Sequence, residues 1–290
     1  MTIAACYLSP EGVVLGADST STMVQPRRPP HYYDHEQKVF EIGEHATLGM
    51  VMWGVGGLGE TSFRTMIAEM ADDLAVNALQ SVADVAARWR AKFWPVYTQV
   101  FAQSITRLRD LARINPRSRD EEEELSRLRM LAGGFCIGGR IPPSRKPEAA
   151  YFTYGPEMSE PTTPGAVGYD RPEFWGVPNL IHRVLFGMDT ELFKSILRSG
   201  KWTGTPQELA NLVIPGIIQM QSRIPLREAI DWGYSSIFIT IKALKFSSLP
   251  TVCGGPIEVA VITSDRSFRW VTHKRLSEAI RQLPFQGEMR

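Results

Sequence analysis

Three residues near the start of the chain could together cleave an amide bond. Thr2 becomes the amino terminus once Met1 is removed, which is usual for a methionine before a small residue. An amino-terminal threonine carries a hydroxyl nucleophile and its own base, because an α-amino group with an ordinary pKa of about 7.7 to 8.0 accepts a proton near neutrality. The ammonium of Lys38 would favour the deprotonated forms of both groups, and the carboxylate of Asp18 would orient that lysine. We therefore expect Thr2 to be a nucleophile that Asp18 and Lys38 activate.

A glycine-rich turn and the residues before it supply further candidates for this chemistry. The backbone amide of Gly56, or alternatively of Gly57, could donate to the oxyanion that forms when a hydroxyl attacks a carbonyl. A tight turn between a strand and a helix explains the same glycines equally well. Met52 and Trp53 precede the turn and are candidates for the substrate pocket.

Cys253 and Gly254 are auxiliary candidates for the same site. A small packed residue beside a glycine turn explains Cys253 better than a reactive thiol does. Together with Cys6 and Cys136 it forms no CxxC motif and no cysteine–histidine cluster, so the sequence signals neither a disulfide framework nor a zinc site.

Two other kinds of site have weaker support. His31 and His35 are spaced like metal ligands, but the text around them is proline-rich and loop-like, so we expect no metal. Gly54, Gly56 and Gly59 match the GxGxxG pattern of a dinucleotide-binding turn, which leaves an oxidoreductase as a remote alternative. That motif also requires a second strand about twenty residues on, where this sequence predicts another helix. We therefore expect no cofactor.

The elements that must hold these residues begin with strands. Alternating or continuous apolar runs predict strands at 3–8, 13–17, 38–42, 46–53, 134–138, 149–154, 166–167, 257–263 and 268–272. The first two form a hairpin, while 19–37 is aperiodic and predicts a loop. Thr2, Asp18 and Lys38 then all lie at strand ends.

Helical spacing follows the glycine-rich turn. It predicts helices at 63–74, at 89–108 with a kink at Pro95, after Pro178, from Thr205 onward, at 224–246 and at the carboxyl terminus. The stretch 113–130 predicts a helical, solvated excursion at a helix end, and 187–222 predicts an inserted helical segment. No linker or repeat is evident, so we expect residues 1–290 to form a single domain.

Composition limits the possible function classes. A chain of 290 residues with 43% hydrophobic and 22% charged residues is ordinary for a globular protein. Its net charge of +1 offers no positive field for a phosphate backbone, so we do not expect nucleic-acid binding. The sequence holds no apolar run long enough to span a membrane and lacks the basic start of a secretory signal. The expectation is a soluble, cytoplasmic protein.

These residues resemble the proteasome β-subunits and their bacterial relatives, which are N-terminal-nucleophile hydrolases. The resemblance spans most of the chain and rests on Thr2 to Ala5, Gly12 to Ser19, Lys38 to Ile42, the Gly56-Gly57 turn and Gly254 to Thr263. Gly176-Val177-Pro178 followed by Arg183 is closer to the bacterial proteasome-like proteins.

The resemblance implies an α+β fold of the four-layer αββα type whose members assemble into rings. It implies Thr2 as nucleophile, Asp18 and Lys38 as partners and Gly56 as oxyanion donor in a threonine-type peptidase or amidohydrolase. The implied partners are a peptide or protein substrate, other copies of the chain in a ring or helical oligomer, and conceivably an ATPase.

Three auxiliary positions depart from the family pattern. Where the family commonly has Ser, Asp and Ser, this chain has Val177, Pro250 and Cys253. Those side chains help to hold the amine and the water. A catalytically silent ring subunit that acts as a scaffold or binding module is therefore the alternative to an active hydrolase.

Overall fold

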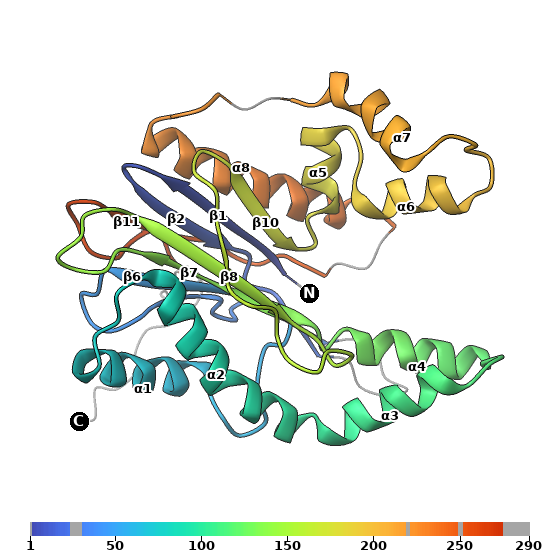
Figure 1. Ribbon diagram of the computed structural model, residues 1–290, viewed down its shortest axis with the longest axis horizontal. Helices are drawn as coiled ribbons and strands as arrows, with labels where there is room; N and C mark the ends of the chain where they lie inside the picture. Colours follow the sequence, from blue (N-terminus) through green and yellow to red (C-terminus); the bar gives the residue numbers. More distant parts are fainter. Residues whose placement is uncertain (1, 24–30, 219–220, 249–251, 275–290) are drawn as a thin grey trace, which may run out of the picture.

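The computed structural model describes residues 2–23, 31–218, 221–248 and 252–274. The protein has a mixed α+β fold with antiparallel sheets and helices outside them (Figure 1). Its strands are β1 (Ile3–Ser9), β2 (Gly12–Ala17), β3 (Ser21–Met23), β4 (His31–Tyr33), β5 (Val39–Glu41), β6 (Leu48–Trp53), β7 (Gly133–Gly139), β8 (Glu148–Tyr154), β9 (Gly165–Ala166), β10 (Pro172–Gly176), β11 (Glu258–Thr263) and β12 (Arg269–Thr272). Its helices are α1 (Phe63–Val76), α2 (Val82–Val100), α3 (Ala102–Arg113), α4 (Arg119–Arg129), α5 (Asn179–Phe186), α6 (Thr190–Arg198), α7 (Pro206–Val213), the 3₁₀ turn η1 (Ile214–Gly216) and α8 (Leu226–Lys245).

Two five-stranded sheets form the centre of the molecule. The first has the order β10-β1-β2-β11-β12 and the second the order β5-β6-β7-β8-β9, with antiparallel pairing throughout. Strands β1 and β2 are buried along their whole length because both faces of the first sheet are covered. The first hairpin and the strand β11 therefore occupy the middle of that sheet.

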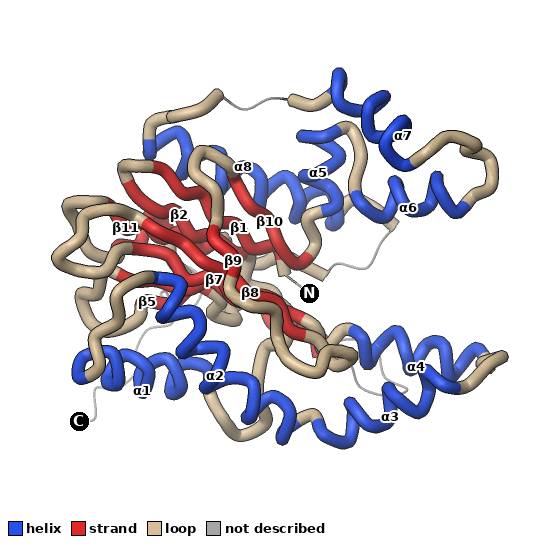
Figure 2. Tube along the Cα trace, viewed as in Figure 1, coloured by secondary structure: helices blue, strands red, loops and turns tan. Residues whose placement is uncertain are grey.

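Three apolar clusters account for the stacking of sheets and helices (Figure 2). One lies between the two sheets and includes Leu15 and Val51. A second lies between the first sheet and the helices α5 and α8, and a third between the second sheet and the helices α1 and α2. At one end the rings of Trp53 on β6 and Trp175 on β10 stack with centroids 4.7 Å apart, which joins the two sheets near Thr2.

Several expectations from the sequence are wrong in detail. Residues 19–37 are not a plain loop, because β3 pairs with β4 in a short two-stranded sheet. The edge strand β10 has no counterpart among the predicted strands, although it pairs with β1 along five positions. The stretch 89–108, expected to be one helix, is divided at Phe101, where α2 ends and α3 begins; Pro95 lies inside α2.

The acidic stretch expected to be a solvated helical excursion contains the helix α4. Ser118 and Glu121 form a capping box at its start, and the run of glutamates lies in its first turns. Leu125 of α4 is buried against Leu108 and Leu111 of α3, which makes the two helices an antiparallel pair. The stretch 113–130 is thus a structured hairpin arm.

Other expectations agree with the structure. Residues 226–245 form the long helix α8, and 258–263 form β11. The segment 187–222 holds α6, α7 and η1, in which Leu209 is buried while Leu212 is 67% exposed. The expected carboxyl-terminal helix lies outside the described residues. No helix in the described part of the chain is long and apolar enough to cross a membrane.

Candidate active site

Asp18 is the centre of a buried hydrogen-bond network at the end of β2. Its Oδ1 accepts hydrogen bonds from the backbone amide of Ile3 (3.0 Å) and from Lys38 Nζ (2.9 Å). Its Oδ2 accepts hydrogen bonds from the backbone amides of Thr20 (3.1 Å) and Gly254 (2.9 Å). The side chain is 0% exposed, so four donors replace the water that a carboxylate would otherwise bind. The carboxylate is therefore fixed in position.

Lys38 lies at the start of β5 and points into the same network. Its ammonium donates to Asp18 Oδ1 and to the backbone carbonyl of Thr20, the latter at 2.6 Å, and its side chain is 6% exposed. An ammonium carries three N–H donors, and two are used by these partners. Among the described residues no acceptor engages the third donor. The side chain also lines a small cavity with Thr2.

Thr2 is held by its backbone between β1 and β10. Its carbonyl accepts a hydrogen bond from the amide of Val177 (2.9 Å), and the neighbouring Ile3 amide is bound to Asp18. Gly176 makes this approach possible: its φ is +85°, and a Cβ at that position would lie 1.8 Å from the carbonyl oxygen of Thr2. Thr2 is 2% exposed, so the residue is buried at the base of the site.

A turn near the other end of the chain closes the network. Gly254 donates to Asp18 and its carbonyl accepts from the amide of Ser19 (2.9 Å). A Cβ at Gly255, which has a φ of +69°, would lie 2.5 Å from the carbonyl of Asp34. These contacts explain why two glycines follow Cys253.

Cys253 is buried beside the network. Burial, with a smaller contribution from the negative charge of Asp18, raises the pKa of its thiol to about 12. The nearby charge of Lys38 opposes this rise. Cys253 is therefore protonated near neutral pH, as expected for a packed residue and not for a nucleophile.

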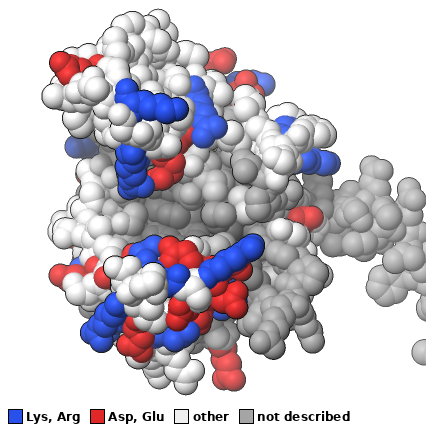
Figure 3. All heavy atoms as spheres, turned by 90° about the vertical axis from the view of Figure 1, so that its right-hand side faces the viewer, with Lys and Arg blue, Asp and Glu red and all other residues white. Residues whose placement is uncertain are grey.

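Two adjoining cavities open at Thr2. The smaller, about 40 Å³, is lined by Thr2, Lys38, Glu36, Thr20 to Thr22 and the stretch from Met52 to Gly56. The larger, about 1160 Å³, extends past Gly57 to the end of α4. Figure 3 shows a hollow between the α6–α7 end of the molecule above and the α3–α4 end below. The volume of the larger cavity is sufficient for several residues of a peptide.

The structure separates the two glycine candidates. Gly56 lines the small cavity with Thr2 and Lys38, and a Cβ on Gly56 would lie 2.9 Å from Ser21 Oγ. Gly57 lines only the large cavity, and a Cβ added at Gly57 would have no atom within 4 Å. The amide of Gly56 is therefore the better candidate for a donor near Thr2.

The two pocket candidates differ in what their side chains contact. Met52 belongs to the cluster between the second sheet and α1 and α2, although it also borders the small cavity. Trp53 faces the first sheet, stacks on Trp175 and borders both cavities. Trp53 is thus a wall of the site, whereas most of Met52 is core.

Sequence reasoning did not identify three residues of this site. The carbonyl of Thr20 binds Lys38, Gly176 admits the carbonyl of Thr2, and Glu36 lines both cavities. Glu36 lies before the strand predicted at 38–42, so no strand pattern pointed to it. Of the auxiliary positions, Val177 touches Thr2 through its amide, and Pro250 lies outside the described residues.

The alternative sites gain no support from the geometry. Asp34, between the two histidines, accepts a hydrogen bond from Thr20 Oγ1 (2.8 Å), and no cluster of metal-binding side chains occurs among the residues described. The strand before Gly54, β6, is antiparallel to both of its neighbours, and α1 leads into α2. The parallel βαβ unit that a dinucleotide-binding turn requires is therefore missing from this part of the structure.

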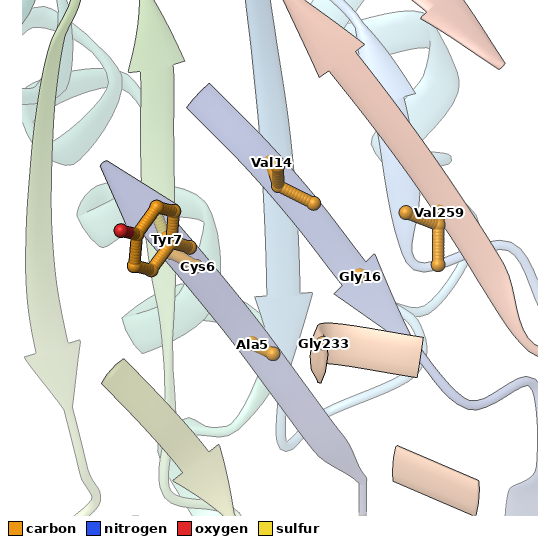
Figure 4. Close-up of a pocket in the computed structure, with 7 residues that line it drawn as sticks. All are labelled: Ala5, Cys6, Tyr7, Val14, Gly16, Gly233 and Val259. Atoms are coloured by element: carbon orange, nitrogen blue, oxygen red, sulfur yellow. The ribbon is translucent and has the colours of Figure 1, made fainter. Parts of the chain in front are cut away.

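A further void lies away from Thr2, between the first sheet and α8 (Figure 4). It has a volume of about 10 Å³ and lies among Ala5, Cys6, Tyr7, Val14, Gly16, Gly233 and Val259. Its walls are almost wholly apolar and its volume is that of about one water molecule. This void is a packing defect and not a site.

In comparisons with known proteins, no family model matches the chain and no curated protein matches it significantly.

Proposed function

We propose that the protein is an N-terminal-nucleophile hydrolase that cleaves amide bonds with Thr2 after removal of Met1. One observation carries the proposal: Asp18 fixes Lys38 by a buried 2.9 Å ion pair, and Lys38 shares a small cavity with Thr2. Thr2 and Lys38, which are 36 positions apart in the sequence, thus meet at one cavity, and Asp18 binds Lys38 behind it. An ion pair with side chains 6% and 0% exposed costs desolvation, which a surface lysine would not incur.

In the proposed mechanism each group has one task. The Thr2 hydroxyl attacks the amide carbonyl, its own α-amine takes the hydroxyl proton, and the free N–H of Lys38 stabilises the negative charge that develops on the threonine oxygen. The Gly56 amide stabilises the oxyanion of the tetrahedral intermediate. The protonated amine then gives its proton to the leaving amine as the C–N bond breaks, and water hydrolyses the resulting ester.

The arrangement of layers supports the same proposal. Two antiparallel sheets with helices on their outer faces are what a four-layer αββα sandwich of the Ntn-hydrolase type would have. In the proteasome β-subunits that the sequence resembles, this fold assembles into rings. We propose a cytoplasmic peptidase or amidohydrolase subunit of a ring or helical oligomer, acting on peptides or proteins with or without an ATPase.

A catalytically silent subunit is the second candidate, and one observation favours it. The positions expected to hold auxiliary hydroxyls carry Val177, whose side chain packs in the apolar cluster under α5 and α8, and Cys253, whose thiol is protonated. Neither side chain replaces the hydroxyl groups that help to hold the amine and the water. In this case the fold would act as scaffold or binding module.

A covalent probe separates these two candidates. Intact-protein mass spectrometry before and after treatment with a peptide epoxyketone, at pH 7.5, should show a mass without Met1 and one adduct on Thr2. The variants Thr2→Ala and Lys38→Ala should form no adduct, while Cys253→Ala should be labelled like the wild type because the thiol, with a pKa of about 12, is not the target.

Two outcomes would contradict the active hydrolase. Retention of Met1 together with no adduct would make the silent subunit the better account. An adduct that persists in Thr2→Ala would place the nucleophile elsewhere.

A further inference from the structure

Glu36 is the acidic side chain that borders Thr2. It lies before β5, and its backbone amide donates to the carbonyl of Ser19 (2.9 Å), which fixes the main chain beside the Asp18 network. The residue lines both the small and the large cavity. Among the described residues around these two cavities it is the one carboxylate.

The carboxylate of Glu36 is half-buried without a direct partner. Within the part of the chain that the structure describes, it forms no hydrogen bond and no ion pair. Burial raises its pKa, and the positive charges of Lys274 and Lys38 oppose that rise from a distance. Removing a charge from water is unfavourable unless a counter-charge or hydrogen-bond donor replaces the water.

Both neighbouring lysines pair with other groups. Lys38 donates to Asp18 and to Thr20. Lys274 forms an ion pair with the fully buried Glu258 (3.3 Å). Neither pairs with Glu36, so a ligand in the cavities that Glu36 lines can supply the missing partner.

The two ends of the large cavity carry different charges. Around Thr2 the other wall residues are Lys38, whose charge is balanced by the carboxylate of Asp18, hydroxyl-bearing residues, glycines and the apolar Met52, Val55 and Trp53. At the far end the wall is α4, with Arg127 and with Arg129, which is paired with Glu157. A positive group on the ligand is thus attracted near Thr2 and repelled near α4.

We propose that Glu36 selects substrates with a cationic side chain next to the bond that Thr2 attacks, such as lysine or arginine. The inference rests on the proposed function and adds its substrate class. A lysine ammonium in the small cavity's mouth would form a charge-assisted hydrogen bond with the Glu36 carboxylate, in a place where the surrounding wall excludes part of the water.

Two peptide epoxyketones test this, identical except that the residue next to the electrophile is lysine in one and norleucine in the other. The two probes therefore differ only in the charged ammonium group of the lysine side chain. Measured by mass spectrometry, the wild type should label on Thr2 about tenfold to a hundredfold faster with the lysine probe, the range expected for one hydrogen bond to a charged group. Glu36→Gln, which keeps the shape of the side chain, should bring the ratio of the two rates close to one.

Two control variants are measured beside Glu36→Gln. Glu36→Asp keeps the charge and should retain a preference for lysine. Glu44→Gln removes an exposed carboxylate that borders neither cavity and should leave the wild-type ratio unchanged.

Equal labelling by the two probes, or faster labelling by norleucine, would overturn the role of Glu36 and leave the hydrolase standing. The same conclusion holds if Glu36→Gln keeps the lysine preference. If neither probe reacts with Thr2, the proposed function fails, and the inference about Glu36 fails with it.

Discussion

Acidic and basic side chains meet in two very different parts of the molecule. In the network around Asp18, the ion pair with Lys38 has side chains 0% and 6% exposed, and backbone amides hold the remaining lone pairs. In the α3–α4 arm the pairs lie on the surface: Arg119 and Glu123 are 90% and 66% exposed. The same residue types thus serve one buried centre and one solvated helix hairpin.

The number of ion pairs in a region therefore says little about how much those pairs contribute to stability. A buried charge that loses its partner keeps its desolvation cost, whereas an exposed charge is stabilised by water instead. The Asp18 network is therefore expected to be sensitive to any single change. The α3–α4 arm should depend on its apolar seam and hardly on its charges.

The largest effect is expected from breaking the buried pair. Asp18→Ala should lower the free energy of unfolding by about 3–5 kcal/mol, because Lys38 would remain buried without its carboxylate. Urea denaturation of the wild type and the variant measures this difference. Labelling of Thr2 should be lost at the same time.

A double variant sharpens the result. Asp18→Ala combined with Lys38→Met removes both charges and should recover part of the lost stability without recovering the labelling of Thr2. If the double variant is as unstable as the sum of the two single variants, the pair is not coupled and its description as one buried unit is wrong.

An intermediate effect is expected at the seam of the α3–α4 arm. Leu125→Ala should cost about 2–4 kcal/mol, since Leu125 is 1% exposed and packs on Leu108 and Leu111. Hydrogen exchange should show the loss of protection in α3 and α4, with β1 and β2 unaffected. A cost below about 1 kcal/mol would mean that the arm collapses around the smaller side chain.

The smallest effect is expected on the surface of the same arm. A double-mutant cycle with Arg119→Ala and Glu123→Ala should give a coupling free energy of no more than about 0.5 kcal/mol in urea denaturation. It should also decrease further in high salt. A coupling comparable to that of Asp18 and Lys38 would contradict the distinction between the two regions.

The buried centre was the more predictable region. Strand patterns place Thr2, Asp18 and Lys38 at strand ends, and an aspartate and a lysine at such points have few reasons to be buried other than each other. The elements β1, β2, β11 and α8 follow from periodicity and turn residues, while the α+β class was implied by the family resemblance. For the charge-rich arm the sequence predicts a solvated helical excursion, and the structure has the helix α4 there, capped by Ser118 and Glu121. The pattern did not indicate how this helix packs, since Leu125 is buried against α3.

What the sequence could not reveal depends on tertiary contacts. The strand β10 contains proline and aromatic residues at an edge, so only its pairing with β1 identifies it. The need for glycine at Gly176 arises from the carbonyl of Thr2, which is distant in the chain. The choice between Gly56 and Gly57 likewise depends on which of them reaches the cavity of Lys38.

The hydrogen bond from Gly254 to Asp18 joins residues that are 236 positions apart. It can therefore form only after most of the chain has been synthesised. A ribosome produces Asp18 early and the turn at Gly254 after more than four-fifths of the chain, so the carboxylate lacks this donor throughout most of translation. Fragments that stop before β11 also lack the central strand that pairs with β2. A nascent or truncated chain therefore carries Thr2 without the completed Asp18 network, and under the proposed function such a chain would be inactive.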